Sequence, residues 1–175
     1  KYGKRVIFDS ARFVENAYFI KTREDGYADK TIKEIVKEMF SLADGMTMSS
    51  KKDGLVNMGG FIATRHEDWY EGAKKFCIPF EGYLTYGGMN GRDMAALAVG
   101  LEENTEFDNI ETRIKQVQYL AARLDEYGIP YQRPVGGHAL FVDADKVLSS
   151  VPKEEFPAQT LAIELYLEAG IRGCE

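Results

Sequence analysis

The sequence has 175 residues, of which 45% are apolar and 29% are charged, and it contains 10 Tyr, 10 Phe and 5 Pro. This length suits one domain, or one large lobe and part of a second, and the composition excludes disordered, collagen-like and disulfide-stapled classes. With 22 basic and 28 acidic residues the net charge is −6, which disfavours a nucleic acid or an anionic membrane surface as a partner. We therefore expect a soluble globular protein.

The cysteines and histidines favour a reducing compartment and disfavour a zinc site. Cys77 and Cys174 lie far apart, and the sequence has only two histidines. No window approaches the roughly 20 apolar residues of a membrane span, and no apolar signal segment opens the sequence. These features favour a cytoplasmic protein that does not bind a membrane.

Strands and helices alternate along the first hundred residues, which favours an α/β fold. A short apolar run before Asp9 is typical of a buried strand, and Thr31 and Glu34 have the spacing of a helical capping box. The predicted elements in chain order are a strand at 6–8, a helix at 31–40, strands at 44–48 and 55–63 with a polar connection between them, and helices at 66–76 and 89–101.

The longest predicted helix follows. Asp108 and Glu111 match a second capping box, and Gly128 and Pro130 end the helix. The later elements are a strand pair around glycines at 131–143 and a helix at 156–169 that Gly170 closes.

The sequence pattern changes from alternating strands and helices to one long helix and then to a glycine-rich segment, which predicts that the chain has three parts. They are part of a large domain at 1–107, a connecting helix at 108–128 and part of a small domain at 129–175. Strand-like segments adjoin both ends of the sequence, at 5–8 and 170–172, so we expect the functional protein to be longer.

Ligands of α/β sheets bind at the carboxyl ends of the strands, and two polar segments are candidates for that edge. Asp9 and Arg12 follow the first strand, where they face one anionic or heteroaromatic ligand or form a surface ion pair. Lys51 and Lys52 lie between two strands, where a tandem lysine suits Schiff-base chemistry or is a solvated turn.

Two further features are weaker signals. Gly87 and Gly88 precede a helix and resemble an anion cradle, but the Lys-Ser/Thr pair of a nucleotide-binding loop is missing. His138 lies in an apolar strand pattern, where a hydrogen-bonded core histidine is the more frequent role than a catalyst.

Seven segments together resemble the β-eliminating amino-acid lyases, the family of tryptophanase and tyrosine phenol-lyase. The resemblance runs the whole length of the sequence, and the segments occur in the family's order. They are Phe-Asp-Ser-Ala-Arg at 8–12, Glu-Asn-Ala-Tyr-Phe-Ile at 15–20, Ser-Ser-Lys-Lys-Asp at 49–53, Leu-Val-Asn-Met-Gly-Gly at 55–60, Thr-Tyr-Gly-Gly-Met at 85–89, Gly-Gly-His-Ala at 136–139 and Glu-Phe-Pro-Ala-Gln at 155–159.

The resemblance implies a pyridoxal 5'-phosphate enzyme of the aspartate-aminotransferase-like fold (PLP fold type I). The chain would be part of its large domain plus the start of its small domain. Lys52 matches the lysine that forms the Schiff base with the cofactor and then takes the Cα proton of the substrate. Asp9 matches the carboxylate that keeps the pyridine nitrogen protonated, and Arg12 matches the residue near the phenolic oxygen.

The remaining matches concern the rim of the site. Ser49 and Lys51 match positions that line the phosphate side, and Tyr86 matches a tyrosine near the cofactor. The backbone of Asn57 matches part of a monovalent-cation site, for potassium. The resemblance also implies a homotetramer, built as a dimer of dimers.

Segments at 85–89, 116–120 and 169–172 are similar to tryptophanases in particular. The resemblance therefore favours β-elimination of L-tryptophan to indole, pyruvate and ammonia over the tyrosine phenol-lyase reaction. The family's phosphate loop, ring-stacking aromatic, leaving-group tyrosine and carboxylate-binding arginine match no residue here, so we expect the isolated chain to be inactive. Two other functions stay open: a non-catalytic α/β interaction module, and a module that binds a phosphorylated ligand at Gly87 and Gly88.

Overall fold

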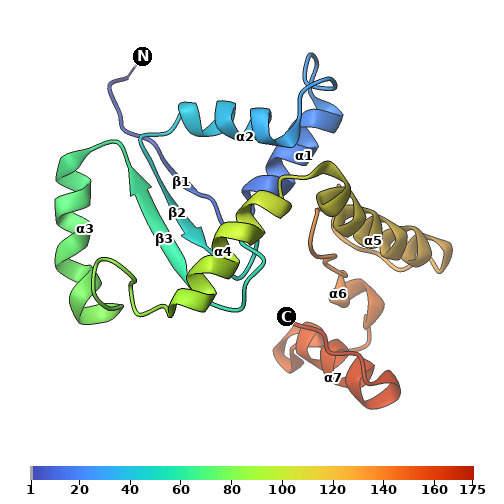
Figure 1. The fold of residues 1–175 in the computed structure, drawn as a ribbon. Helices are drawn as coiled ribbons and strands as arrows, with labels where there is room; N and C mark the ends of the chain where they lie inside the picture. The colour runs from blue at the N-terminus through green and yellow to red at the C-terminus, as the bar shows by residue number, and fades with distance from the viewer. Residues whose placement is uncertain (1) are drawn as a thin grey trace. The chain divides into compact units, whose positions relative to one another are not determined.

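A computed structural model describes residues 2–175 (Figure 1). Within these residues the elements are β1 (Ile7–Asp9), α1 (Phe13–Arg23), α2 (Ile32–Ser41), β2 (Gly45–Ser49), β3 (Gly60–Thr64), α3 (Glu67–Phe80), α4 (Gly91–Glu103), α5 (Phe107–Glu126), α6 (Ala144–Val147), the 3-10 helix η1 (Lys153–Glu155) and α7 (Pro157–Ala169). Among them no helix is long and apolar enough to cross a membrane.

The chain divides into two compact units, one that ends at Thr112 and one that spans Arg113–Glu175. The helix α5 begins in the first unit and ends in the second. The domain boundaries predicted at residues 107 and 128 remain a prediction.

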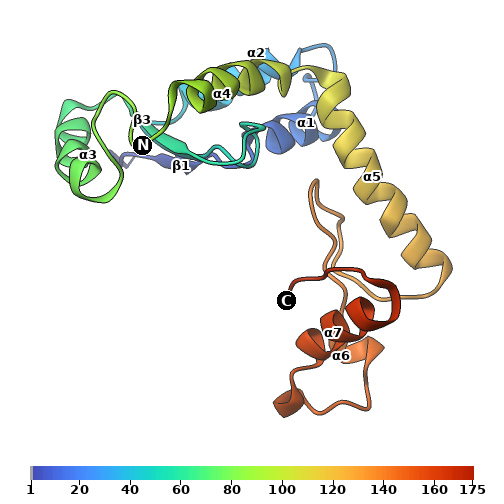
Figure 2. The ribbon, with the colours of Figure 1, turned by 60° about the horizontal axis from the view of Figure 1, so that its bottom comes forward.

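Three strands make up the sheet within residues 2–175, in the order β1-β2-β3. β1 pairs with β2 in parallel, with Asp9 opposite Thr47, and β2 pairs with β3 in antiparallel, with Ser49 opposite Gly60. The carboxyl ends of β1 and β2 therefore lie at the edge where β3 begins. In Figure 2, α2 and α4 both lie on one side of these strands.

The capping box predicted at the start of the 31–40 helix is confirmed. The Oγ1 of Thr31 accepts the backbone N–H of Glu34 at 3.2 Å, and the Glu34 carboxylate accepts the backbone N–H of Thr31 at 2.8 Å. Ile32 and Ile35 of this helix are fully buried. The backbone N–H groups of Thr31 and Glu34 both find acceptors within the first turn, so α2 begins where the sequence predicts.

The helix α1 was not among the predicted elements. Its first residues Phe13, Val14, Ala17 and Tyr18 are buried and form the core of the first unit together with α2. Its N-cap residue, Arg12, makes no side-chain capping hydrogen bond. The usual start signal of a helix is therefore missing from the local sequence.

The prediction that residues 6–8 form a buried strand is wrong in its burial. Val6 is 43% exposed and Ile7 is 54% exposed. β1 is the end strand in the order of the sheet, so it has a neighbour on one side only. Phe8, whose ring centre lies 6.2 Å from that of Phe40 on α2, is half-buried.

Two predicted boundaries are corrected. The strand expected at 55–63 begins at Gly60, because Leu55 and Gly59 have φ angles of 55° and 98°, which a strand does not allow. The helix expected to start with a capping box at Asp108 begins at Phe107. Asp108 therefore lies inside the first turn, where a carboxylate is favourable toward the helix dipole.

Three predictions fail in the second unit. The strand pair at 131–143 reduces to one bridge between Tyr131 and Val142, since Pro134 has no N–H to continue a ladder. His138 is exposed rather than part of the core, and residues 170–175 form no helix or strand. The helix at 157–169 does end at Gly170, whose φ of 65° is the left-handed conformation that glycine favours.

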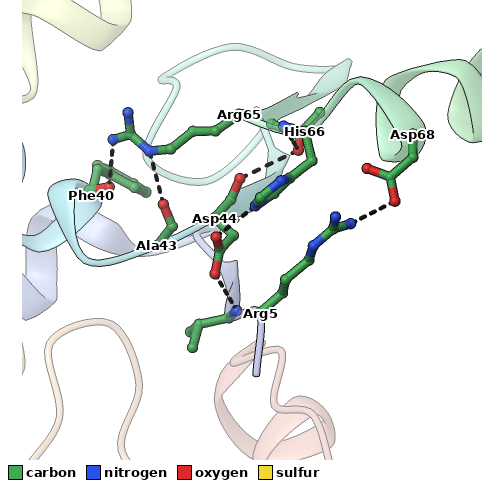
Figure 3. Close-up of polar contacts among 9 residues, drawn as sticks. Arg5, Phe40, Ala43, Asp44, Arg65, His66 and Asp68 are labelled. Atoms are coloured by element: carbon green, nitrogen blue, oxygen red, sulfur yellow. Dashed lines mark hydrogen bonds and ion pairs between the residues drawn. The ribbon is translucent and has the colours of Figure 1, made fainter. Parts of the chain in front are cut away.

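The amino edge of the sheet is tied together by Asp44 (Figure 3). Its Oδ2 accepts the backbone N–H of Val6 at 2.7 Å, and its Oδ1 lies 2.6 Å from Nε2 of His66. The hydrogen bond to His66, and then that from Val6, lowers the pKa of the Asp44 carboxyl. The carboxylate thus joins the segment before β1 to the residue before α3.

Two arginines complete this cluster. Arg65 donates from Nε to the carbonyl of Ala43 at 3.0 Å and from Nη2 to the carbonyl of Phe40 at 3.2 Å. Arg5 pairs with Asp68 of α3 at 2.6 Å. The carbonyl groups at the end of α2 are therefore satisfied by a side chain from beyond β3.

We predict that Asp44→Asn makes the stability of the protein less dependent on acidic pH. The pKa of this carboxyl is lower in the folded state than its unfolded value of about 3.9, so its stabilising effect is present above that value and is lost as the pH falls through the folded pKa. The free energy of unfolding in urea should fall less in Asp44→Asn than in the wild type between about pH 6 and about pH 3.

The control is Asp25→Asn, which replaces an exposed aspartate in a turn. It should keep the pH dependence of the wild type. An Asp44→Asn protein that loses as much stability as the wild type over this pH range would contradict the assignment.

Candidate functional site

The predicted site residues gather at the carboxyl edge of the sheet. Asp9 is the last residue of β1 and Ser49 is the last residue of β2. Lys52 lies in the connection from β2 to β3, residues 50–59, which we call the lysine loop. The parallel pairing of β1 with β2 is what brings the end of one strand to the end of the other.

The two tandem lysines have different surroundings. Lys52 is half-buried, and its Nζ donates a hydrogen bond to Oγ of Ser49 at 3.0 Å, while Lys51 is exposed. The backbone N–H of Lys52 also donates to the carbonyl of Ser49 at 3.2 Å, which closes a tight turn. The description as a solvated turn therefore fits Lys51 and does not fit Lys52.

Asp53 joins the lysine loop to the segment that follows Asp9. It is fully buried, and its Oδ2 accepts the backbone N–H of Val14, in the first turn of α1, at 2.7 Å. Its own N–H donates to the carbonyl of Ala11 at 3.2 Å. A carboxylate from a distant loop thus takes the place of the N-cap side chain that α1 lacks, and it also satisfies the positive end of the helix dipole.

The other side of the lysine loop is fixed to α4. The side-chain amide of Asn104, at the end of α4, is buried and donates to the carbonyl of Asp53 at 2.9 Å. Gly100 of α4 meets Gly54 so closely that a Cβ on Gly100 would lie 2.1 Å from the Gly54 carbonyl oxygen. The loop is therefore held between the start of α1 and the last turns of α4.

The same loop contains two costly features. Leu55 has a φ of 55°, a left-handed conformation that is unfavourable for a residue with a branched side chain. Ser50 is fully buried, and its Oγ has no hydrogen-bond partner among residues 2–175. Backbone strain and unsatisfied polar groups of this kind cluster at functional sites, where the surrounding structure imposes them.

Three predicted site residues stand apart from this centre. The guanidinium of Arg12 lies 3.6 Å from the carboxylate of Glu15, and among residues 2–175 it forms no ion pair with Asp9. Tyr86 and Asn57 are exposed on loops, and within the described residues neither bonds to Asp9, Ser49 or Lys52. The structure therefore brings together Asp9, Ser49 and Lys52, with Lys51 beside them, and the roles of all seven residues stay predictions.

The glycine segment before α4 does not form the expected anion cradle. The N–H groups of Tyr86 and Gly87 donate to the carbonyl of Tyr83, at 3.1 and 2.7 Å, and that of Met89 donates to Tyr86 at 2.8 Å. The N-terminus of α4 is capped by the side chain of Asn90. These donors are used within the chain, which removes the main argument for a phosphate bound there.

Asp9 also lines a pocket of about 320 Å³ on the α2 side of β1. Three aromatic rings and the amide of Asn16 border it beside the carboxylate; the rings are those of Phe8, Phe13 and Phe40. Within residues 2–175 no group of three or more His, Cys, Asp or Glu side chains could hold a metal ion. The aromatic side chains thus border the pocket that Asp9 lines, and Lys52 is not among the residues that line it.

Sequence reasoning missed Asp53, Asn104 and the close approach of Gly54 and Gly100. Two signals were present in the sequence. Phe13, Val14, Ala17 and Tyr18 have helical spacing, and the residue before them, Arg12, is no capping residue. A helix start with no local cap requires an acceptor from elsewhere in the chain.

The comparisons with known proteins agree on one family. The model of the beta-eliminating lyase family matches residues 1–175. A probable beta-eliminating lyase of Trichomonas vaginalis is 78% identical over all 175 residues, which cover 38% of that relative. A tyrosine phenol-lyase of Fusobacterium nucleatum is 54% identical, again over the whole chain and 38% of the relative.

A tryptophanase of Salinibacter ruber is 52% identical over 99% of the chain and 37% of the relative. The chain thus spans less than two fifths of the length of each of these three relatives. Relatives named for two different substrates match it almost equally well.

We predict that Gly100→Ala destabilises the protein although alanine is the better helix former. Inside a helix the change from glycine to alanine is worth about 1 kcal/mol in favour of alanine. Here the new Cβ would lie 2.1 Å from the Gly54 carbonyl oxygen, and relieving such a clash costs about 1–3 kcal/mol or more. Thermal unfolding should therefore show a lower midpoint for the variant.

The matched control is Gly72→Ala in the interior of α3, where a Cβ meets no atom within 4 Å. That change should raise the unfolding midpoint through helix propensity alone. A Gly100→Ala protein that gains stability as Gly72→Ala does would show that the loop and α4 are not in tight contact.

Proposed function

The chain belongs to the beta-eliminating lyase family, and we propose that the full-length protein is a pyridoxal-phosphate-dependent lyase that acts on an aromatic L-amino acid. The observation that supports the proposal best is the placement of the Lys52 amine and the Asp9 carboxylate at one edge of the sheet, linked through Asp53. Members of this family use that cofactor, and we propose that the first unit is part of the large domain of PLP fold type I.

The residues at the carboxyl edge of the sheet fit the cofactor chemically. Within the described part of the chain Lys52 has a hydroxyl group as its partner and no carboxylate, so its amine is not held in an ion pair there and is able to react with an aldehyde. Asp9 supplies a carboxylate that accepts the N–H of Ala11 at 3.3 Å. Ser49 and Lys51 offer a hydroxyl and a cation, the donors that a phosphate group needs.

Each residue then has a defined task. When bound, pyridoxal phosphate supplies an electron sink for the electrons of the substrate Cα–H bond. The Asp9 carboxylate would hold the pyridine end of the cofactor, because a nearby negative charge favours a protonated ring nitrogen. The Nζ of Lys52 would hold its aldehyde end and would supply the base for the Cα proton of the substrate.

Two amino-acid substrates are candidates. The tryptophanase-like segments at 85–89 and 169–172 favour tryptophan, with indole as the leaving group. The relative named tyrosine phenol-lyase, at 54% identity, favours tyrosine. We propose tryptophan as the first candidate, tyrosine as the second, and potassium at the Asn57 backbone as the monovalent cation.

We predict that the cofactor is attached to Lys52 in the full-length protein. Borohydride reduction of the protein with bound cofactor, followed by peptide mapping, should place the label on Lys52, the half-buried amine. Lys51→Ala is the matched comparison: it removes the neighbouring exposed amine, and whatever cofactor still binds should carry its label on Lys52. A label on Lys51, or on no lysine, would refute the proposal.

We predict that tryptophan is the better substrate. A pocket built to hydrogen-bond the indole N–H discriminates strongly against a ring that lacks this donor. Assays of the full-length protein at saturating potassium should give a higher kcat/KM for release of indole than for release of phenol. The opposite order would assign the protein to tyrosine and leave the lyase reaction in place.

A further inference from the structure

We propose that Asp53 is a positioning residue that sets the placement of Lys52 relative to Asp9 by binding the N-terminus of α1. This inference rests on the proposed function, since it concerns the geometry of the same site. Asp53 follows Lys52 directly in the chain, so any change in its position moves the lysine backbone with it.

Four hydrogen bonds make the link. On one side, Asp53 accepts the Val14 N–H at 2.7 Å and donates its own N–H to Ala11 at 3.2 Å. Ala11 in turn donates its N–H to the Asp9 carboxylate at 3.3 Å, and the N–H of Ser10 donates to the carbonyl of Thr47 in β2 at 2.8 Å. The carboxylate of Asp9 and the backbone of Lys52 are thus two short bonded steps apart.

The other side of the loop has no freedom to compensate. Asn104 binds the carbonyl of Asp53 at 2.9 Å, and Gly54 lies against Gly100 of α4. Because α4 holds the loop on its other side, the hydrogen bonds of Asp53 set how the loop meets the start of α1. Misplacement of a reacting group by about 1 Å can lower the rate about 100-fold, so this contact matters for catalysis.

The charge of Asp53 adds to the hydrogen bond. A carboxylate at the first turn of a helix interacts favourably with the helix dipole as well as with the N–H group. An asparagine keeps an acceptor for the Val14 N–H and loses the charge, whereas an alanine loses both. The two substitutions therefore separate the acceptor from the charge.

The test uses the full-length protein with Asp53→Ala, Asp53→Asn and, as a matched control, Asp44→Ala. Asp44 also accepts a backbone N–H at 2.7 Å, from Val6, but at the opposite edge of the sheet. Three readouts are compared: hydrogen exchange at the Val14 amide, the ratio of reductive methylation of Lys52 to that of Lys51 in cofactor-free protein, and kcat and KM of the loaded enzyme.

We expect Asp53→Ala to lose protection at Val14 and to raise the Lys52 to Lys51 methylation ratio severalfold, because the half-buried amine is released. Its kcat should fall by about 10–100-fold with KM changed by less than about threefold. Asp53→Asn should recover most of both effects. Asp44→Ala should lower the unfolding midpoint and leave the methylation ratio and kcat unchanged.

An Asp53→Ala protein with the wild-type methylation ratio and kcat would overturn the proposal, and so would an Asp44→Ala protein that shifts both as much. If Asp53→Ala does not fold, Asp53→Asn decides. A partial loss of Val14 protection with a raised methylation ratio supports the proposal, and the same loss with an unchanged ratio overturns it. The methylation ratio needs no lyase activity, so an inactive wild type would refute the proposed function and leave this result readable.

Discussion

The buried carboxylate of Asp53 at the N-terminus of α1 is the contact on which the geometry of the first unit depends. The sheet orders β1 and β2, but the segments that follow these strands, at 10–12 and 50–59, are neither helix nor strand. A buried carboxylate with a satisfied acceptor is stable, whereas the same group without a donor would be expensive to bury. The cap of α1 and the closure of the lysine loop therefore depend on the same residue.

At the opposite edge of the sheet a carboxylate again accepts a backbone N–H, but this carboxylate is more exposed to solvent. Asp44 accepts the N–H of Val6, and its other oxygen lies 2.6 Å from Nε2 of His66. The hydrogen bonds with His66 and Val6 lower the pKa of Asp44, so this contact stabilises the fold until the pH falls through that pKa. Asp53 is shielded from water and orders a loop. Lys52 lies at the edge that the buried Asp53 orders.

The rigidity of the lysine loop has a chemical consequence. A nucleophilic amine benefits when its side chain is confined near the reacting atom, because the entropy of positioning has then been lost during folding. The left-handed Leu55, the unpartnered hydroxyl of Ser50 and the glycine contact with α4 each cost stability. These unfavourable features lie together around Lys52. A loop in which the position of the lysine matters more than stability is expected to contain such features.

The sequence by itself determined the elements whose signals are local. Thr31 and Glu34 cap α2 because both partners lie within one turn, and Gly170 ends α7 because its backbone can turn left-handed. The order of motifs also determined the family. Only the tertiary structure decided what depends on residues far apart: the pairing of β1 with β2, the exposure of Ile7 and the cap of α1 by Asp53, 39 positions away. Such contacts form through hydrogen bonds and close packing between segments, and no periodicity in the sequence encodes which segments meet.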